Sequence, residues 1–230
     1  MRSHADAAAR VRVQSLSNIP FDLTTTTVTR LIRAKNPPDD AYLIVQQEAA
    51  ERFVGAPRCT LVAALTFPWF EATIVHAFDR RDFVPAPRVE VVMLRLRRRG
   101  PPLVAPEQAQ MYRDFVVAVF TARADSVRGT LRSLLGNQLG SRLARRFWRI
   151  QAKPSQTRPT QLVELFGAAS HILGDPLQWR VADAERRLQH QHMRLQKMHR
   201  TRVRHLRPPP GAVLQCQHSA MAGASVRGQG

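Results

Sequence analysis

Five consecutive residues, Ser17-Asn18-Ile19-Pro20-Phe21, combine groups that together could hold a planar amine. An asparagine carbonyl can accept the hydrogens of an amine, proline fixes its own φ and lacks an N–H, and an aromatic ring can stack on a base. An isolated Asn-x-Pro is more often a simple turn. The surrounding sequence favours a functional site over that simpler interpretation.

The segments on either side of the motif indicate how it is positioned. Val11–Val13 is a short alternating run that predicts a strand, and Leu23–Ile32 predicts a helix that opens with threonines. The motif would then lie on a strand-to-helix turn, at the carboxyl end of a strand. Open α/β sheets bind their ligands at that edge.

Further strands and helices alternate downstream of the motif. Ala41–Val45 has the length and apolar character of a buried parallel strand. Helical patterns follow at Gln46–Phe53 and at Arg58–Phe67. Trp69–Phe78 and Val89–Leu96 predict two more strands, joined by a loop without a helix as an antiparallel hairpin at the sheet edge. This alternation predicts an α/β fold.

The run Arg97–Pro102 marks a boundary, after which the apolar spacing is helical. Three to four helices are expected there, with Asp125-Ser126 as a candidate cap for one of them. The expected organisation is a disordered start at 1–10, a partial α/β domain at 11–99, a helical RNA-binding domain at 100–170, a basic helical extension at 171–207 and a disordered tail at 208–230.

The chain is strongly basic, with a net charge of +18 and a pI near 11.7. Such a charge favours polyanionic partners, nucleic acid first among them. Lysine occurs only at Lys35, Lys153 and Lys197, so arginine supplies nearly all of the positive charge. Its planar fork suits phosphate and stacks on bases. A GC-rich genome would also enrich arginine, and we expect both causes to apply.

The cysteine and histidine positions narrow the possible chemistry. Cys59 and Cys216 form no CxxC pair and no disulfide framework, which predicts a reducing compartment. His190 and His192 are two residues apart, a spacing unsuited to one helix face, and we expect no metal site.

The start has no apolar core of a signal peptide, and no apolar run is long enough for a membrane span. A soluble, cytoplasmic and monomeric protein is expected.

Four segments occur in an order that resembles a known family: Asn18–Phe21, Leu43–Arg52, Phe83–Val89 and Met111–Val116. Together they resemble the rRNA adenine-N6 methyltransferases, over about Arg12 to Phe166. They look most like the Erm type, which acts on 23S rRNA and gives resistance to macrolides, lincosamides and streptogramin B. The small-subunit rRNA adenine dimethyltransferases are the alternative branch. The resemblance implies the C-terminal half of a Rossmann-like methyltransferase sheet, followed by a small all-helical domain.

The resemblance also implies roles for individual residues. Asn18 would bind the target amine and touch the methyl donor, S-adenosylmethionine. Pro20 would supply rigidity, and Phe21 would stack on the flipped adenine. Phe83 matches the second aromatic of the family, which helps to hold that adenine. The alternative for Phe83 is a core anchor at the start of a strand.

Two groups of cations are candidates for RNA binding. The first interleaves cations with aromatics near residue 147, although half of that group could equally be helix core. The second lies on the basic extension, which could also be a solvated helix rather than an arm along RNA phosphates. The candidate residues are Arg145, Arg146, Arg149, Arg186, Arg187, Arg194, Lys197 and Arg200.

The sequence departs from the family in its donor-binding half. No Gly-rich turn follows a strand, and the G-x-G at Gly228 and Gly230 lies in the predicted tail. Roughly the first three βα units of a doubly wound sheet are missing before Asn18. We therefore expect poor donor affinity, and two alternatives stay open: a non-catalytic RNA-binding fragment and a poorly folded gene remnant.

Overall fold

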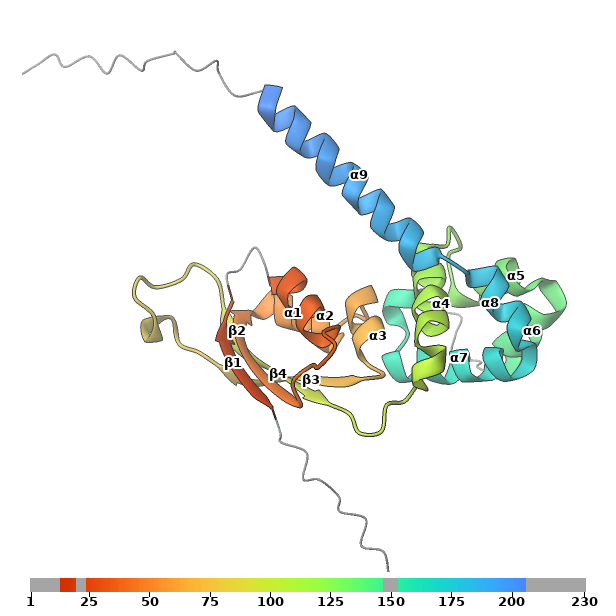
Figure 1. The fold of residues 1–230 in the computed structure, drawn as a ribbon, viewed down its shortest axis with the longest axis horizontal. Coiled ribbons are helices and arrows are strands. Elements are labelled where there is room, and N and C mark those ends of the chain that lie inside the picture. The colour runs from red at the N-terminus through yellow and green to blue at the C-terminus, as the bar shows by residue number, and fades with distance from the viewer. Residues whose placement is uncertain (1–12, 20–23, 147–152, 206–230) are drawn as a thin grey trace, which may run out of the picture. The chain divides into compact units, whose positions relative to one another are not determined.

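The computed structural model describes residues 13–19, 24–146 and 153–205. A mixed β-sheet with helices on one face is followed by further helices, so the predicted α/β fold is confirmed (Figure 1). Two compact units divide the chain between Leu188 and Gln189. The sheet, the helices up to residue 181 and the first turn of the last helix all belong to the first unit. The predicted domain boundaries at 99 and 170 remain predictions.

Four strands form the sheet in the order β1-β2-β4-β3. They span Gln14–Asn18 (β1), Asp40–Gln46 (β2), Phe70–Ala77 (β3) and Val91–Arg98 (β4). β1 runs parallel to β2, whereas β4 is antiparallel to both β2 and β3. The predicted antiparallel hairpin at the sheet edge is therefore confirmed, and β4 lies inside the sheet between β2 and the edge strand β3.

The first strand lies later in the chain than its apolar pattern predicts. The expectation placed it at Val11–Val13, but β1 is the polar segment Gln14–Asn18; residues 11 and 12 lie outside the described residues. The register explains the shift. The Val13 carbonyl accepts the backbone N–H of Asp39 at 2.9 Å, just before the ladder pairs Gln14 with Asp40. Backbone pairing with β2, rather than side-chain alternation, determines where this strand begins.

β1 uses only one side of its backbone to pair with β2. Val13 and Ile19 make hydrogen bonds to the β2 side, and alternate residues of a strand direct their backbone groups to opposite sides. The groups of Gln14, Leu16 and Asn18 therefore point away from β2, and no strand in the described part of the chain pairs with them. The Leu16 side chain is 73% exposed.

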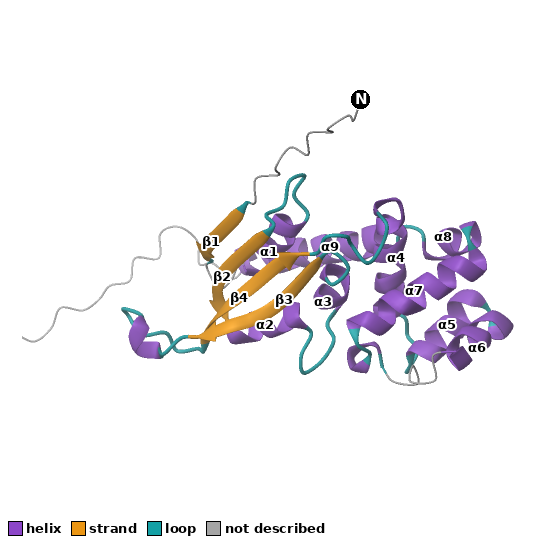
Figure 2. Cartoon of the chain, turned by 90° about the horizontal axis from the view of Figure 1, so that it is seen from below, coloured by secondary structure: helices purple, strands orange, loops and turns teal. Residues whose placement is uncertain are grey.

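Three helices cover one face of the sheet, as Figure 2 shows from the strand side. They are α1 (Thr24–Ile32), α2 (Gln47–Val54) and α3 (Leu61–Thr66). The inward residues of β2, Ala41, Leu43 and Val45, are buried beneath them. Gly55 ends α2 with φ 75°, a left-handed conformation that glycine adopts without strain. The predicted helices at 46–53 and 58–67 are confirmed.

The remaining helices pack around a second apolar core, in which Tyr112, Phe115 and Phe166 are the largest buried side chains. Tyr112 also donates a 2.9 Å hydrogen bond to the carbonyl of Ala64, which joins α4 to α3. Ser126 caps its helix as predicted, accepting the Gly129 N–H at 3.1 Å. The helices are α4 (Ala109–Thr121), α5 (Val127–Leu135), α6 (Asn137–Arg146), α7 (Pro159–Leu173), α8 (Asp175–Val181) and α9 (Ala184–His205).

Two helical glycines provide a matched test of this packing. A Cβ on Gly140 in α6 would lie 2.6 Å from the backbone of Arg132 in α5, whereas a Cβ on Gly167 in α7 would meet nothing within 4 Å. Gly140→Ala is expected to lower the free energy of unfolding by about 1–3 kcal/mol. Gly167→Ala is expected to raise it by about 0.5–1 kcal/mol, because alanine has the better helix propensity. Urea denaturation would measure both; equal effects would contradict the close α5–α6 contact.

Candidate functional site

Three segments meet at the carboxyl edge of the two parallel strands. The Ile19 N–H donates to the carbonyl of Ile44 at 3.3 Å, which holds the end of β1 beside β2. The Gln47 N–H donates to the Glu90 carbonyl at 3.0 Å, so the start of α2 lies beside the loop before β4. The end of β1 at Asn18 and Ile19, the N-terminus of α2 and the loop 78–90 therefore share one edge, the position predicted for a ligand.

Asn18 is the last residue of β1, and it is exposed. The next residue, Ile19, is only 3% exposed and packs in the sheet core with Val28 of α1. An exposed amide thus follows a polar strand and precedes a buried anchor, which fixes the point where the chain leaves the sheet. The other two residues of the predicted catalytic turn, Pro20 and Phe21, lie outside the described residues.

The loop 78–90 is held in shape by its own polar contacts. Asp79 and Asp82 form a reciprocal capping box, and Arg80 donates to Glu90 at 2.6 Å. Phe83 packs edge-on against Phe78, with the ring centroids 5.6 Å apart. It is half-buried and is not a core anchor. The Asp-x-x-Asp spacing was the sequence signal for this cap, and it was missed.

The face of the sheet opposite the helices carries ordered ion pairs. Arg95 makes a two-pronged contact with Asp40, at 2.9 and 2.5 Å, and lies over the Tyr42 ring at 5.4 Å. The hydrogen bond that Arg95 donates to Asp40 raises the pKa of Arg95. A hydrogen bond from Arg97 lowers the pKa of Glu71 on the neighbouring strand. These contacts fix the cations of this face in place and offset part of their charge.

The predicted RNA-binding cations are only partly described. Arg145 and Arg146 are exposed at the end of α6, whereas Arg149 lies outside the described residues. Arg186 and Arg187 are exposed at the start of α9; Arg186 pairs with Asp183 at 2.9 Å, and Arg187 donates to the Ala182 carbonyl at 2.8 Å. Arg194 is exposed within the second unit, and the structure does not describe the side chains of Lys197 and Arg200.

The described residues do not form a complete site for S-adenosylmethionine. Asn18 is the only residue for which a donor contact is predicted, and the described strands β1 and β2 are followed by Ile19 and Gln47 rather than by a Gly-rich turn. Among the residues that the structure describes, no three His, Cys, Asp or Glu side chains cluster closely enough for a metal ion. None of the helices in the described ranges is long and apolar enough to cross a membrane.

The fold and the site define an α/β protein with an exposed amide at the carboxyl end of β1, followed by a helical portion rich in arginine. The family profile of ribosomal RNA adenine dimethylases matches residues 8–171, and the chain belongs to this family. The predicted membership is therefore confirmed.

Both branches of the family are among the relatives. An rRNA adenine N-6-methyltransferase of Corynebacterium diphtheriae is 36% identical over 51% of this chain and 46% of its own length. The mycinamicin-resistance protein MyrB of Micromonospora griseorubida is 32% identical over 52% of this chain and 38% of its own length. Ribosomal RNA small subunit methyltransferase A of Lactococcus lactis is 26% identical over 55% of this chain and 44% of its own length. The chain thus spans about half the length of the curated relatives it matches.

Solved structures confirm the fold. The 23S rRNA methyltransferase ErmE superposes with a TM-score of 0.59 at 27% identity, over 67% of this chain and 64% of that one. A dimethyladenosine transferase from Plasmodium falciparum superposes with a TM-score of 0.55 at 15% identity, which supports the fold alone. The sheet and helices described above therefore correspond to part of a methyltransferase fold.

Proposed function

We propose that this chain carries the catalytic turn and the RNA-facing part of an rRNA adenine-N6 methyltransferase that acts on 23S rRNA. The observation that carries the proposal is the exposed Asn18 at the carboxyl end of β1, on the same edge of the sheet as the loop that contains Phe83. Two relatives above 30% identity, the Corynebacterium enzyme and MyrB, favour the Erm-type branch over the small-subunit branch. Resistance to macrolides, a cytoplasmic location and a monomeric state belong to the same proposal.

The residues of the turn would prepare the base for reaction. The exocyclic amine of adenine is a poor nucleophile because its lone pair is delocalised into the ring. An Asn18 carbonyl that accepts one amine hydrogen would favour the geometry in which the lone pair is available. Pro20 would hold the neighbouring backbone carbonyl toward the second hydrogen. Phe21 and Phe83 would stack on the flipped adenine.

S-adenosylmethionine would supply the electrophilic methyl group when it is bound. Of the described residues, Asn18 alone is proposed to reach it, so donor binding by this chain is expected to be weak. The contribution of the chain is then to orient the amine, to stack the base and to hold the RNA through its exposed arginines.

The proposal is tested by two measurements on the purified chain. Calorimetry would measure S-adenosylmethionine binding, and transfer of a labelled methyl group would be compared between 23S and 16S rRNA. Transfer to 23S rRNA alone would support the Erm-type assignment, whereas transfer to 16S rRNA alone would favour the small-subunit branch. A folded chain that binds RNA but neither binds the donor nor transfers methyl groups would be a non-catalytic RNA-binding fragment, the second candidate. The exposed arginines of α6 and α9 favour that candidate.

A further inference from the structure

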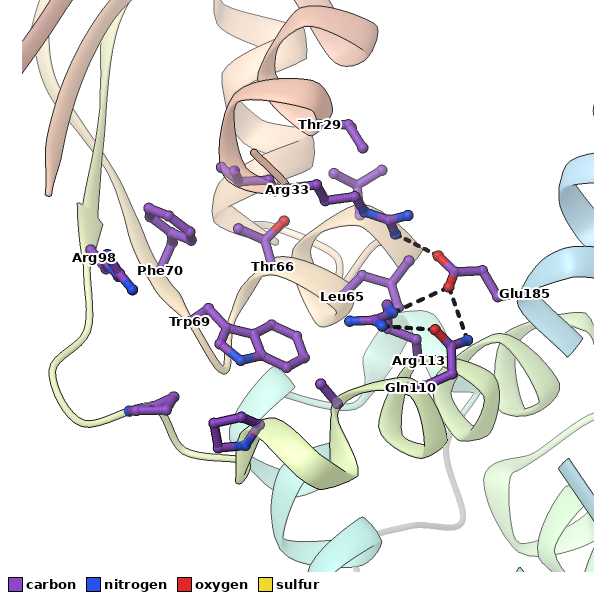
Figure 3. Close-up of a pocket in the computed structure, with 15 residues that line it drawn as sticks. Thr29, Arg33, Leu65, Thr66, Trp69, Phe70, Arg98, Gln110, Arg113 and Glu185 are labelled. Carbon is purple, nitrogen blue, oxygen red and sulfur yellow. Dashed lines mark hydrogen bonds and ion pairs between the residues drawn. The ribbon is translucent and has the colours of Figure 1, made fainter. Parts of the chain in front are cut away.

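A cavity lies away from the predicted catalytic turn. Its volume is about 640 Å³, within the usual range for small-molecule sites. It is formed where α1, α3, α4 and the first turn of α9 meet, all within the first compact unit (Figure 3). Its apolar wall consists of Ile32, Val62, Leu65, Trp69, Phe70, Pro102, Pro106 and Ala109.

The polar lining of this cavity is predominantly cationic. Arg33, Arg98 and Arg113 line it together with a single carboxylate, that of Glu185. The Glu185 side chain is 9% exposed and is shared between Arg33, at 2.5 Å, and Arg113, at 3.2 Å. Gln110 also donates to it at 3.3 Å. Arg98 also lies 4.0 Å from the carboxylate of Asp39, so Glu185 is shared by two guanidinium groups, those of Arg33 and Arg113. One carboxylate cannot neutralise both, and this part of the cavity therefore favours an anion.

Trp69 gives the cavity an aromatic wall between its cations. The indole lies between Arg98 on one side and Arg113 on the other (Figure 3). It packs T-shaped against Tyr112, with the ring centroids 5.7 Å apart, which fixes its orientation. Fixed aromatic rings beside arginines are typical of sites that stack an unpaired base and hold its phosphate.

The cavity lies at the opposite end of the strands from Asn18. Arg98 ends β4, whose preceding residue Arg97 pairs with Asp40 at the start of β2. Asn18 pairs with Ile44 near the other end of that strand. Asp40 and Ile44 are four residues apart on β2, which at ~3.3 Å per residue separates the two positions by about 13 Å along the strand. The cavity is therefore not the pocket for the target adenine.

We propose that this cavity binds an unpaired nucleotide of RNA, with its base stacked on Trp69 and its phosphate held by Arg33 and Arg113. The claim that this nucleotide belongs to RNA rests on the proposed function. The nucleotide would be part of the rRNA substrate, at a distance from the methylated adenine. A phosphate ion alone would not contact the apolar wall or the Trp69 ring, and this distinguishes the site from a simple phosphate site. A free nucleotide would satisfy the same chemistry, so the experiment has one arm for each source.

The first test measures the affinity of the purified chain for AMP by calorimetry, and for a short single-stranded RNA by fluorescence anisotropy. Trp69→Leu is expected to weaken both about tenfold or more, in the range for loss of one stacked base. Trp69→Phe keeps an aromatic ring and is expected to retain most of the affinity. Trp179→Leu, at a side chain that is 82% exposed, is the matched control. Unchanged affinity for both probes in Trp69→Leu, with normal melting, would overturn the proposal.

A second variant is expected to change AMP affinity in the opposite direction. Glu185→Gln removes the carboxylate that occupies Arg33 and Arg113, so AMP binding is expected to tighten severalfold even if the protein melts at a lower temperature. Glu164→Gln, an exposed carboxylate on α7, changes the net charge equally and is expected to leave AMP binding nearly unchanged. If both variants changed AMP binding equally, Arg33 and Arg113 would have only a structural role, and the proposal would be overturned.

The outcomes separate this proposal from the proposed function. If Trp69→Leu weakens AMP binding but not RNA binding, the ligand is a free nucleotide and the RNA assignment is overturned. If the cavity proposal fails altogether, methyl transfer that depends on Asn18 would still be observed. If instead no methyl is transferred but Trp69 and Glu185 affect RNA binding as expected, the cavity stands and the enzymatic proposal fails.

Discussion

Replacing Asn18 by alanine is expected to lower methyl transfer to rRNA by about 10²–10³-fold, the effect of removing one well-placed hydrogen-bonding group from a transition state. The alanine variant loses the carbonyl that is proposed to accept an amine hydrogen. Asn18 is exposed at the end of β1, so the substitution leaves no cavity in either core. Transfer of a labelled methyl group, at saturating donor and RNA, would measure the change.

Two companion variants make this prediction specific. Asn18→Asp keeps an accepting oxygen and is expected to retain more transfer than the alanine variant. Ser17→Ala alters an exposed neighbour on the same strand and is expected to change transfer little. RNA affinity should be the same in all three. Unchanged methyl transfer in Asn18→Ala would remove the assignment of this turn as catalytic.

Phe166→Ala is expected to lower the free energy of unfolding by about 3–5 kcal/mol, the usual cost of removing a large buried ring. Phe166 is 2% exposed. Its ring packs edge-on against Tyr112 at 5.2 Å and at a tilt against Phe115 at 5.7 Å. These three side chains join α7 to α4, so their loss would loosen the helical core and the contacts of α4 with α3. Chemical denaturation followed by circular dichroism would measure the loss.

An exposed aromatic in the same part of the chain provides the control. Trp179 on α8 is 82% exposed, and Trp179→Ala is expected to change the free energy of unfolding by less than about 0.5 kcal/mol. If Phe166→Ala were as mild, the helical part would lack the close packing described here. A non-cooperative transition in the parent chain would instead support the earlier alternative of a poorly folded remnant.

The parts of the fold that could be predicted are those in which side chains carry the signal. The apolar run Ala41–Val45 marks β2, because its inward residues are buried. The alternation in Trp69–Phe78 marks β3, in which Phe70 is the one buried residue. Gly55 marks the end of α2, since only a left-handed residue closes that turn without strain. The motif around Asn18 marks the carboxyl edge of β1 even though the strand itself begins later than predicted.

Other features depend on long-range contacts that a local pattern does not contain. β1 is polar and is held by backbone pairing with β2, so its periodicity gave no signal. The cationic cavity needs Arg33, Arg113 and Glu185, which come from segments up to 152 residues apart. Each of these residues looks like an ordinary charged residue of an amphipathic helix in the sequence. Only tertiary packing brings them together around Trp69.

The outward-facing backbone of β1 has a consequence for the behaviour of the protein at high concentration. Natural sheets protect their edge strands with charges, prolines or bulges. Gln14–Asn18 carries none of these, and Leu16 adds an exposed apolar side chain. Such a strand is a template on which another extended chain can add. Colloidal solubility, rather than thermodynamic stability, would then set the upper limit on the concentration at which this chain can be handled.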